Sequence, residues 1–174
     1  MAQLSYSIDT PAVAFPGQLV DIAPGRDIVT AMASVAIPYG CLVVRSSAAS
    51  FQAVIGKLPV SAAEITAVGS AIGVAVADQA RAQDPSVSGP QYAALAAVPC
   101  LKKRRIWVVV EDAVLAGGAC FVRFLAGTNG SQLGAFRSDV DTISTVDHAA
   151  ALPGARFVAA AGAGEYAVVE LDLA

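Results

Sequence analysis

Few residues in this sequence are of the types that perform chemistry, and they are not grouped as an enzyme requires. The single histidine, His148, stands next to Asp147, and serines are abundant, so the residue types of a Ser-His-Asp triad are present. No Gly-x-Ser-x-Gly nucleophile elbow occurs, however. A lone histidine in a loop-like stretch is usually a surface residue. We therefore predict no catalytic residues and no enzymatic activity.

The cysteines do not form a metal-binding pattern. Cys41, Cys100 and Cys120 are widely spaced, and no Cys-x-x-Cys occurs. A zinc site needs about four Cys, His or carboxylate ligands at close spacing. The sequence therefore predicts no metal site. With no export signal at the N-terminus, an odd number of cysteines indicates reduced thiols in a chain made in a cytosol.

Two glycine motifs resemble cofactor-binding loops only superficially. Gly162-x-Gly164-x-x-Ala167 matches the dinucleotide fingerprint, but an alternating strand pattern follows it where the fingerprint requires a helix. We interpret it as a hairpin turn. Gly56-Lys57 lacks both the earlier glycine and the following Ser or Thr of a phosphate-binding loop. No cofactor and no small-molecule substrate are predicted.

One charge run stands out, and its role is open at this point. Lys102, Lys103, Arg104 and Arg105 hold four of the eleven basic residues. They fit a solvated strand start that protects a sheet edge from aggregation. They also fit a docking patch for an acidic partner surface. Nucleic acid is a weaker third option, because four residues without interleaved aromatics make a small footprint.

The composition explains why chemistry is scarce and points to assembly. Of the 174 residues, 56% are hydrophobic and only 14% are charged, against about 25% in an ordinary soluble domain. A membrane-spanning helix needs about 18 or more consecutive apolar residues, which the prolines and glycines interrupt. Obligate protein interfaces, by contrast, are depleted in charge. The net charge of −3 argues against a general nucleic-acid binder.

The elements that must position these residues are predicted to be strands. Short runs rich in valine and isoleucine recur between turn residues, at 18–22, 41–45, 71–77, 105–111, 119–124, 155–159 and 165–173. Residues 61–68 are the one helix candidate, because Ser61 and Glu64 form a capping-box pattern. Trp107 is predicted to lie in the core. Residues 78–90 and 127–131 resemble loops.

The fold class expected from these elements is mainly β. We predict one β-rich domain over residues 15–174, either a β-barrel or a jelly-roll-like sandwich, with long loops and at most one short helix. Residues 1–14 are low in charge and show no clear pattern, so we predict that they form an extended arm.

The order of several segments resembles the structural cement, or capsid decoration, proteins of tailed bacteriophages. These segments cover most of the chain from Phe15 to Leu173, at residues 15–21, 37–40, 72–76, 106–110, 153–157 and 165–171. Membership would imply a barrel or jelly-roll-like body without catalytic residues. It would also imply a homodimer or homotrimer bound to the major capsid protein on the outside of the virion, after assembly in the host cytoplasm.

Such a protein would stabilise contacts between capsomers by adding contact area across their junctions. The alternative is a carbohydrate- or receptor-binding β-sandwich module of a phage or bacterial surface. Its sites usually need aromatic platforms and clustered Asp or Asn, whereas this chain has one Trp and 6% aromatic residues. A terminal arm could also add a strand to the exposed sheet edge of a neighbour.

Overall fold

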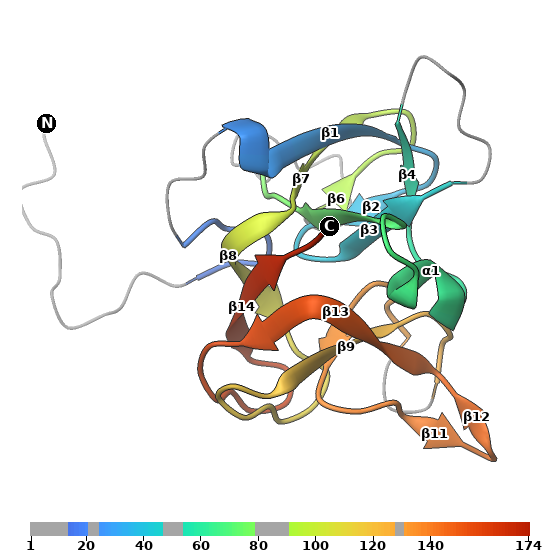
Figure 1. The fold of residues 1–174 in the computed structure, drawn as a ribbon, viewed down its shortest axis with the longest axis vertical. Helices are drawn as coiled ribbons and strands as arrows, with labels where there is room; N and C mark the ends of the chain where they lie inside the picture. The colour runs from blue at the N-terminus through green and yellow to red at the C-terminus, as the bar shows by residue number, and fades with distance from the viewer. Residues whose placement is uncertain (1–13, 21–24, 47–53, 79–90, 128–130) are drawn as a thin grey trace, which may run out of the picture.

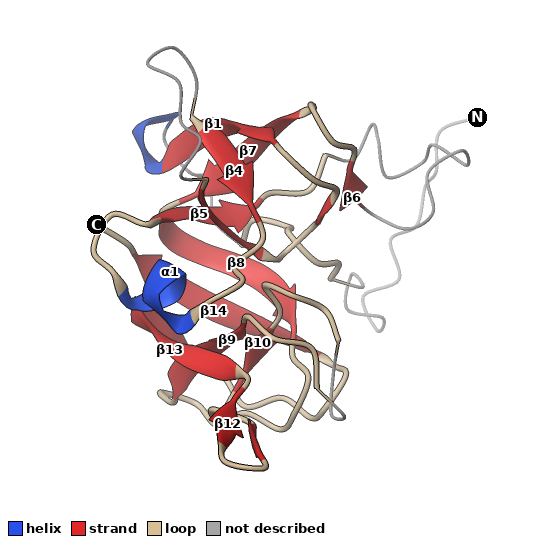
Figure 2. Ribbon diagram, turned by 90° about the vertical axis from the view of Figure 1, so that its right-hand side faces the viewer, coloured by secondary structure: helices blue, strands red, loops and turns tan. Residues whose placement is uncertain are grey.

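The structure is a computed structural model that describes residues 14–20, 25–46, 54–78, 91–127 and 131–174. It contains two β-structures placed one above the other, as Figures 1 and 2 show. The upper one is a closed barrel, and the lower one is an open five-stranded sheet. The prediction of a mainly β fold with a barrel is therefore confirmed.

The barrel consists of five short strands. In spatial order they are β1 (Ile28–Ala33), β4 (Ile55–Lys57), β3 (Leu42–Arg45), β5 (Ala71–Ala75) and β7 (Ala97–Leu101). β1 closes the barrel by pairing parallel with β4 and antiparallel with β7. Closure gives each of these five strands two neighbours, so the barrel itself has no unpaired sheet edge.

The lower sheet is antiparallel throughout. Its order is β10 (Phe136–Arg137), β9 (Ala119–Arg123), β13 (Ala149–Phe157), β14 (Tyr166–Asp172) and β8 (Lys103–Val109). The longest ladder joins β14 to β8, from Tyr166 opposite Val109 to Asp172 opposite Lys103. β13 and β14 are joined across the Gly162–Gly164 segment, so the predicted hairpin is confirmed.

Several smaller elements complete the described chain. β2 (Ile37–Pro38) pairs with β6 (Gln91–Tyr92), and β11 (Thr142–Ile143) pairs with β12 (Val146–Asp147) in a hairpin that projects from the sheet end in Figure 1. A 3-10 turn, η1 (Gly25–Asp27), precedes β1.

The predicted helix exists but its capping box does not form. α1 spans Ala62–Thr66, and the Ser61 side chain makes no capping hydrogen bond. The Glu64 carboxylate instead accepts hydrogen bonds from the Lys57 ammonium at 2.7 Å and from the Val60 amide at 2.8 Å. A lysine across the turn offers a stronger, charge-assisted partner than the backbone N–H of the capping position.

The barrel interior is filled by small and medium apolar side chains. Ala31 and Ala33 of β1 point inward with Val43, Ile72, Val98 and Cys100. At Gly56 a Cβ atom would lie 2.6 Å from the Val43 Cγ1 and 3.1 Å from the Ala31 Cβ, so no larger residue fits without a shift. Tyr39 and Tyr92 pack edge to face at one side of this cluster, with ring centroids 4.9 Å apart.

The second core lies between the barrel and the sheet. Leu42 and Val44 of β3 project away from the barrel interior and pack with Ile106, Val108 and other residues of the sheet. β3 is buried on both faces over Leu42–Val44, which is why it reads as a continuous apolar run instead of an alternating one. Ile65 brings α1 onto the same core.

Trp107 differs from its prediction. The side chain is half-buried and is not part of either core cluster, because it alternates with the buried residues Ile106 and Val108 on β8. The backbone of residues 17–20 covers the outer edge of β8 here: the Gly17 amide donates to the Trp107 carbonyl at 2.8 Å, and the Trp107 amide donates to the Gln18 carbonyl at 2.9 Å.

The predicted arm lies outside the described residues except for Ala14, and so does most of the predicted 78–90 loop.

Candidate functional site

The basic run lies where the barrel joins the sheet. β7 of the barrel ends at Leu101, and β8 of the sheet begins at Lys103, so Lys102 is the one residue between these two strands. The link bends sharply, since Arg104 has a positive φ of 93°. Lys103, Arg104 and Arg105 are exposed, as a solvated strand start would be.

Each of these three exposed side chains faces a carboxylate of the same chain. The Lys103 ammonium lies 2.8 Å from Asp172, and the Arg104 guanidinium lies 2.8 Å from Asp27 of η1. Arg105 donates to Glu170 at 3.2 Å. The run thus connects the sheet to the turn before the barrel, and its charge is largely balanced within the molecule.

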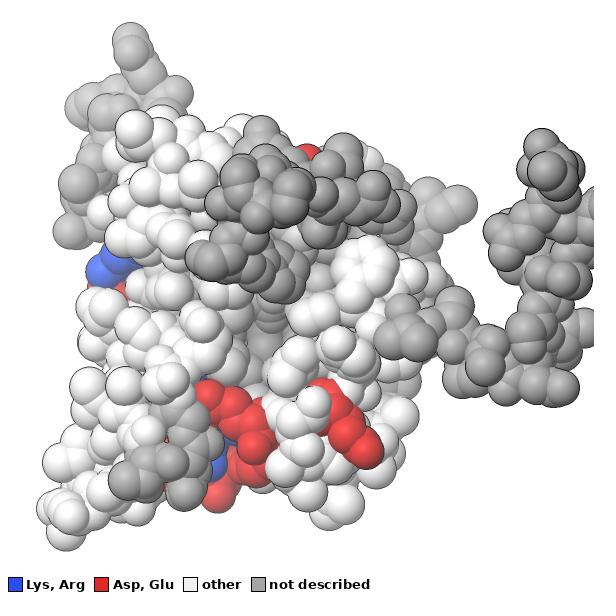
Figure 3. Space-filling view, turned by 180° about the vertical axis from the view of Figure 1, so that it is seen from behind, with Lys and Arg blue, Asp and Glu red and all other residues white. Residues whose placement is uncertain are grey.

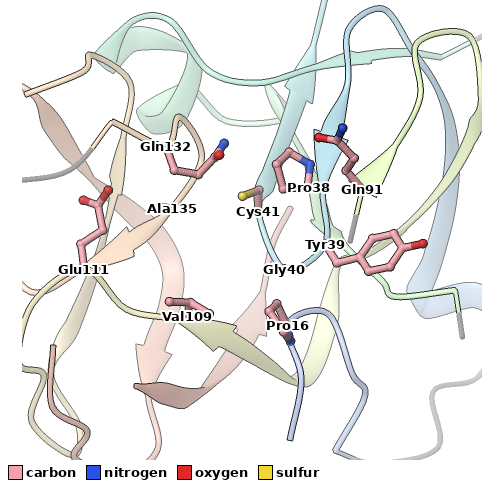
Figure 4. A pocket seen from close by; sticks show the side chains of 10 residues that line it. All are labelled: Pro16, Pro38, Tyr39, Gly40, Cys41, Gln91, Val109, Glu111, Gln132 and Ala135. Atoms are coloured by element: carbon pink, nitrogen blue, oxygen red, sulfur yellow. The ribbon is translucent and has the colours of Figure 1, made fainter. Parts of the chain in front are cut away.

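A pocket of about 350 Å³ opens between the barrel and the sheet. Figure 4 shows Tyr39, Gly40 and Cys41 on the barrel side, with Val109 and Glu111 on the sheet side. The remaining lining residues are Pro16, Pro38, Gln91, Gln132 and Ala135. Most of this surface is apolar, and Glu111 is the one ionisable carboxylate among the residues that line it.

Behind Glu111 lies a cluster of charged residues that we call the ionic core. It consists of Glu111, Asp112, Arg123, Arg137, Asp139 and Asp141. The Arg123 side chain is fully buried and lies 2.7 Å from both Glu111 and Asp141. Arg137, which is 4% exposed, contacts all four carboxylates at 2.7 to 3.4 Å.

The ionic core positions a segment that has little regular structure of its own. Between β9 and β13 the described chain forms only the two-residue strands β10, β11 and β12. Arg123 on β9 and Arg137 on β10 reach Asp139 and Asp141 in this segment, so ion pairs replace part of the missing ladder. Buried guanidiniums need such complete pairing because an unpaired buried charge is strongly destabilising.

Burial raises the pKa of Glu111 above its usual value of 4.5, although hydrogen bonds from Arg123 and Arg137 act in the opposite direction. The negative charge of Glu111 also acts across the pocket on Cys41. Burial is the larger cause and the Glu111 charge is the smaller one, and together they raise the pKa of the Cys41 thiol to about 12. Cys41 is therefore a neutral thiol in this site at physiological pH.

His148 is not the surface residue that its position in the sequence suggests. It is 9% exposed, and its Nδ1 has no hydrogen-bond partner. Gly127 packs over it: a Cβ atom there would lie 2.9 Å from His148 Nδ1 and 3.0 Å from Asp141 Oδ2. The histidine is buried because its backbone carbonyl accepts the Phe124 and Leu125 amides, which fixes it beside β9.

The three cysteines are free and buried, as predicted for reduced thiols. Burial raises the pKa values of Cys100 and Cys120 to about 12 as well. No group of three or more His, Cys, Asp or Glu residues with metal-binding geometry occurs among the described residues. Within the same part of the chain, no helix is long and apolar enough to cross a membrane.

The surface is poor in charge and carries exposed apolar side chains. Figure 3 shows a face on which acidic residues gather in the lower part while most of the remaining described surface is uncharged. At one end of the barrel Met32, Val35 and Leu95 are 37%, 45% and 75% exposed. We call these three residues the barrel-end patch; the Leu95 amide donates to the Ala33 carbonyl, which holds them together.

Sequence reasoning missed the pocket and the ionic core. Arg123 follows an apolar strand pattern and Arg137 lies in a loop-like stretch, so neither signals burial. The spacing of Glu111, Asp112, Asp139 and Asp141 becomes meaningful only once β9 and β10 pair, which they do through Phe136 opposite Val122.

Comparisons with known proteins agree with this architecture. The family model of the structural cement protein (E217 gp24/Pam3 gp6) matches residues 2–172. A chain from the capsid of Myoviridae phage XM1 is similar in fold, with a TM-score of 0.63, 12% identity, and coverage of 99% of this chain and 98% of that chain.

A chain from the head fiber gp8.5 N base of bacteriophage phi29 shares a TM-score of 0.39 and 14% identity, over 83% of this chain and 92% of that chain. No curated protein sequence matches. Because the family model covers nearly the whole chain, the chain belongs to the phage structural cement protein family.

Proposed function

We propose that this protein binds the outer surface of a tailed-phage capsid and holds neighbouring capsomers together as a homodimer or homotrimer. Its family is one of structural capsid proteins, so its role is structural and its place is the virion. A cement protein acts by adding contact area, because separating two capsomers must then also break its own interfaces. Assembly in the host cytoplasm fits the three reduced cysteines.

The observation that carries the proposal is the uncovered apolar surface of the barrel-end patch. Leu95 is 75% exposed and has a positive φ of 66°, a conformation that is unfavourable for leucine. A large apolar side chain at a strained, exposed position does not stabilise the monomer. Exposed apolar patches of this kind mark sites of protein–protein contact.

The test is sedimentation with expanded, undecorated capsids of the same phage, using Leu95→Asn. Asparagine tolerates positive φ better than leucine does, so the variant should fold at least as well as the wild type. We expect it to pellet with capsids at least tenfold less well. Leu115→Asn is the matched control, because Leu115 is also 75% exposed but lies in the turn before β9.

Wild-type protein that stays in the supernatant at every salt concentration would contradict the proposed function. If Leu95→Asn binds like the wild type while Leu115→Asn does not, the contact surface lies at the other end of the molecule. Light scattering of the purified protein tests the oligomer separately, and a stable monomer would contradict the dimer or trimer.

Two earlier predictions stay open and have their own tests. If Lys102, Lys103, Arg104 and Arg105 dock onto an acidic capsid surface, the double variant Lys102→Gln/Lys103→Gln should bind more weakly and with a smaller salt dependence.

If residues 1–14 form an arm that pairs with a neighbour, their deletion should lower capsid binding while the thermal stability of the body stays unchanged.

A further inference from the structure

The pocket between the barrel and the sheet combines apolar walls with one buried acid. Pro16, Tyr39 and Val109 contribute apolar surface, and Glu111 contributes a carboxylate that is 10% exposed. Val109, the last residue of β8, and Glu111, just beyond it, both line the pocket on its sheet side, as Figure 4 shows. A ligand that enters the pocket meets the apolar wall and the carboxylate together.

The charge behind this pocket is not balanced. The ionic core contains four carboxylates and two guanidiniums, which gives it a formal charge of −2. In a partly buried site this excess is screened less than on an open surface. Burial separately raises the pKa of Glu111, because it disfavours the charged carboxylate more than the hydrogen bonds from the two arginines favour it.

We infer that the pocket is the receptor for an arginine or lysine side chain of the major capsid protein. The aliphatic stem of such a residue suits Val109 and Pro16, while its charged end suits Glu111. The volume of about 350 Å³ is ample for one long side chain. That the partner is a capsid protein rests on the proposed function; the preference for a cation rests on the pocket alone.

Other occupants fit the chemistry less well. Arg123 and Arg137 already pair with Glu111, and what stays uncompensated is the excess charge of the ionic core, which a purely apolar side chain would not balance. The segment 1–13 of a second copy contains no lysine, arginine or histidine. A metal ion would need further ligands, and none of the described residues group in that way.

The first test uses small probes and needs no capsid. N-acetyl-arginine methylamide is titrated into the isotope-labelled full chain, with N-acetyl-norleucine methylamide as an uncharged probe of similar length. We expect the arginine probe to shift the amide resonances of Gly40, Val109 and Glu111 with at least tenfold higher affinity. Equal binding of both probes, or of neither, would overturn the preference for a cation.

The second test places a cation in the pocket permanently. Val109→Lys puts an ammonium on the pocket wall beside Glu111, so it should occupy the site and weaken capsid binding at least tenfold. Val109→Met keeps an apolar side chain of similar length and should stay within about threefold of the wild type. Val158→Lys is the matched control, because Val158 is also 38% exposed and lies outside the pocket.

The outcomes separate this inference from the proposed function. If wild-type protein and Val109→Lys bind capsids equally well, the pocket is not a capsid contact and the inference fails while the proposed function stands. If Val109→Lys instead disrupts the oligomer, the occupant is a second copy and the capsid assignment fails. If the wild type itself does not bind, the proposed function fails and the capsid partner with it.

Discussion

The barrel and the sheet solve the same packing problem in different ways. The barrel closes on itself around alanines, valines and a glycine, and no charged side chain belongs to its interior cluster. The sheet stays open, and at its β9–β10 end two buried arginines hold an irregular segment in place. A closed ladder satisfies its backbone internally, whereas a segment with few ladder bonds needs side chains to fix its position.

This difference also predicts how each half responds to substitutions, to pH and to salt. The interior of the barrel is intolerant of volume changes, and it should respond little to pH and salt because its cluster of described residues contains no carboxylate or base. The stability of the sheet should depend on both pH and salt, because of the ionic core and the ion pairs of β8 and β14. Three experiments test this division, in order of decreasing expected effect.

Removing Arg123 should have the largest effect. Arg123→Met leaves the buried Glu111 and Asp141 with Arg137 as their one remaining cation among the described residues, and breaking buried pairs in this way costs about 3–5 kcal/mol. Urea unfolding of the wild type and the variant at pH 7 measures the difference. Arg156→Met is the control, because its pair with Glu170 is exposed and its loss should lower the stability far less.

The Arg123→Met variant also shows whether the loss of stability is confined to the sheet. We expect Cys120 of β9 to react with a thiol reagent before Cys100 of β7 does, measured in proteins that each keep one of the two cysteines. Simultaneous exposure of both thiols would mean that barrel and sheet unfold as one unit, and the division between them would not hold.

Enlarging a residue of the barrel interior should have an intermediate effect. Gly56→Ala puts a Cβ atom 2.6 Å from the Val43 Cγ1, and overpacking of this kind costs about 1–3 kcal/mol. Thermal unfolding measures it, and Gly25→Ala is the control because nothing lies within 4 Å of its Cβ position. The double variant Val43→Ala/Gly56→Ala should lose less than the sum of the two single variants; additive losses would argue against a direct clash.

The smallest expected effect on stability comes from the exposed ion pairs of Glu170, and it depends on pH. A hydrogen bond from Arg156, followed by Arg105, lowers the pKa of Glu170 below its usual value of 4.5. A carboxyl whose pKa is lowered by folding stabilises the fold above its unfolded pKa and stops doing so as the pH falls through its folded pKa. Wild type should therefore exceed Glu170→Gln in stability at pH 7, and the gap should close below the folded pKa.

Glu111 has the opposite sign. Because folding raises its pKa, its ionised form opposes folding above that pKa, and protonation relieves this on acidification.

Urea unfolding of wild type and Glu170→Gln from pH 7 to pH 3 measures the Glu170 contribution by difference. A gap that widens toward low pH would show that Glu170 does not act through these ion pairs.

Much of the fold followed from local pattern, and the site did not. The strand near 105–111 was predictable because it is a β-branched and aromatic run bounded by charges. The strand near 165–173 was predictable from its alternating pattern, and Gly162 and Gly164 indicate the hairpin that joins it to 155–159. The paired barrel strands were visible as short apolar runs. Their closure into a ring depends on β1 meeting both β4 and β7, which no local pattern encodes.

The ionic core was invisible for a physical reason. Burial of Arg123 depends on two carboxylate-bearing segments, 111–112 and 139–141, that meet only after β9, β10 and the 138–148 segment have folded together. The burial of His148 has the same origin. Trp107 differs from its prediction for another reason. A large aromatic residue in a valine-rich strand suggests the core, but the Trp107 side chain alternates with the buried Ile106 and Val108 and so points to the other face of β8.

The ladder between β8 and β14 also has a mechanical side. Its hydrogen bonds run across the strands, so a force along the strands is shared by all of them, whereas a force across the strands opens them one after another. β8 continues directly from the barrel through Lys102, and tension between the two halves therefore enters the ladder at its Lys103–Asp172 end. The molecule resists being pulled apart along β8 far better than it resists being peeled from the side.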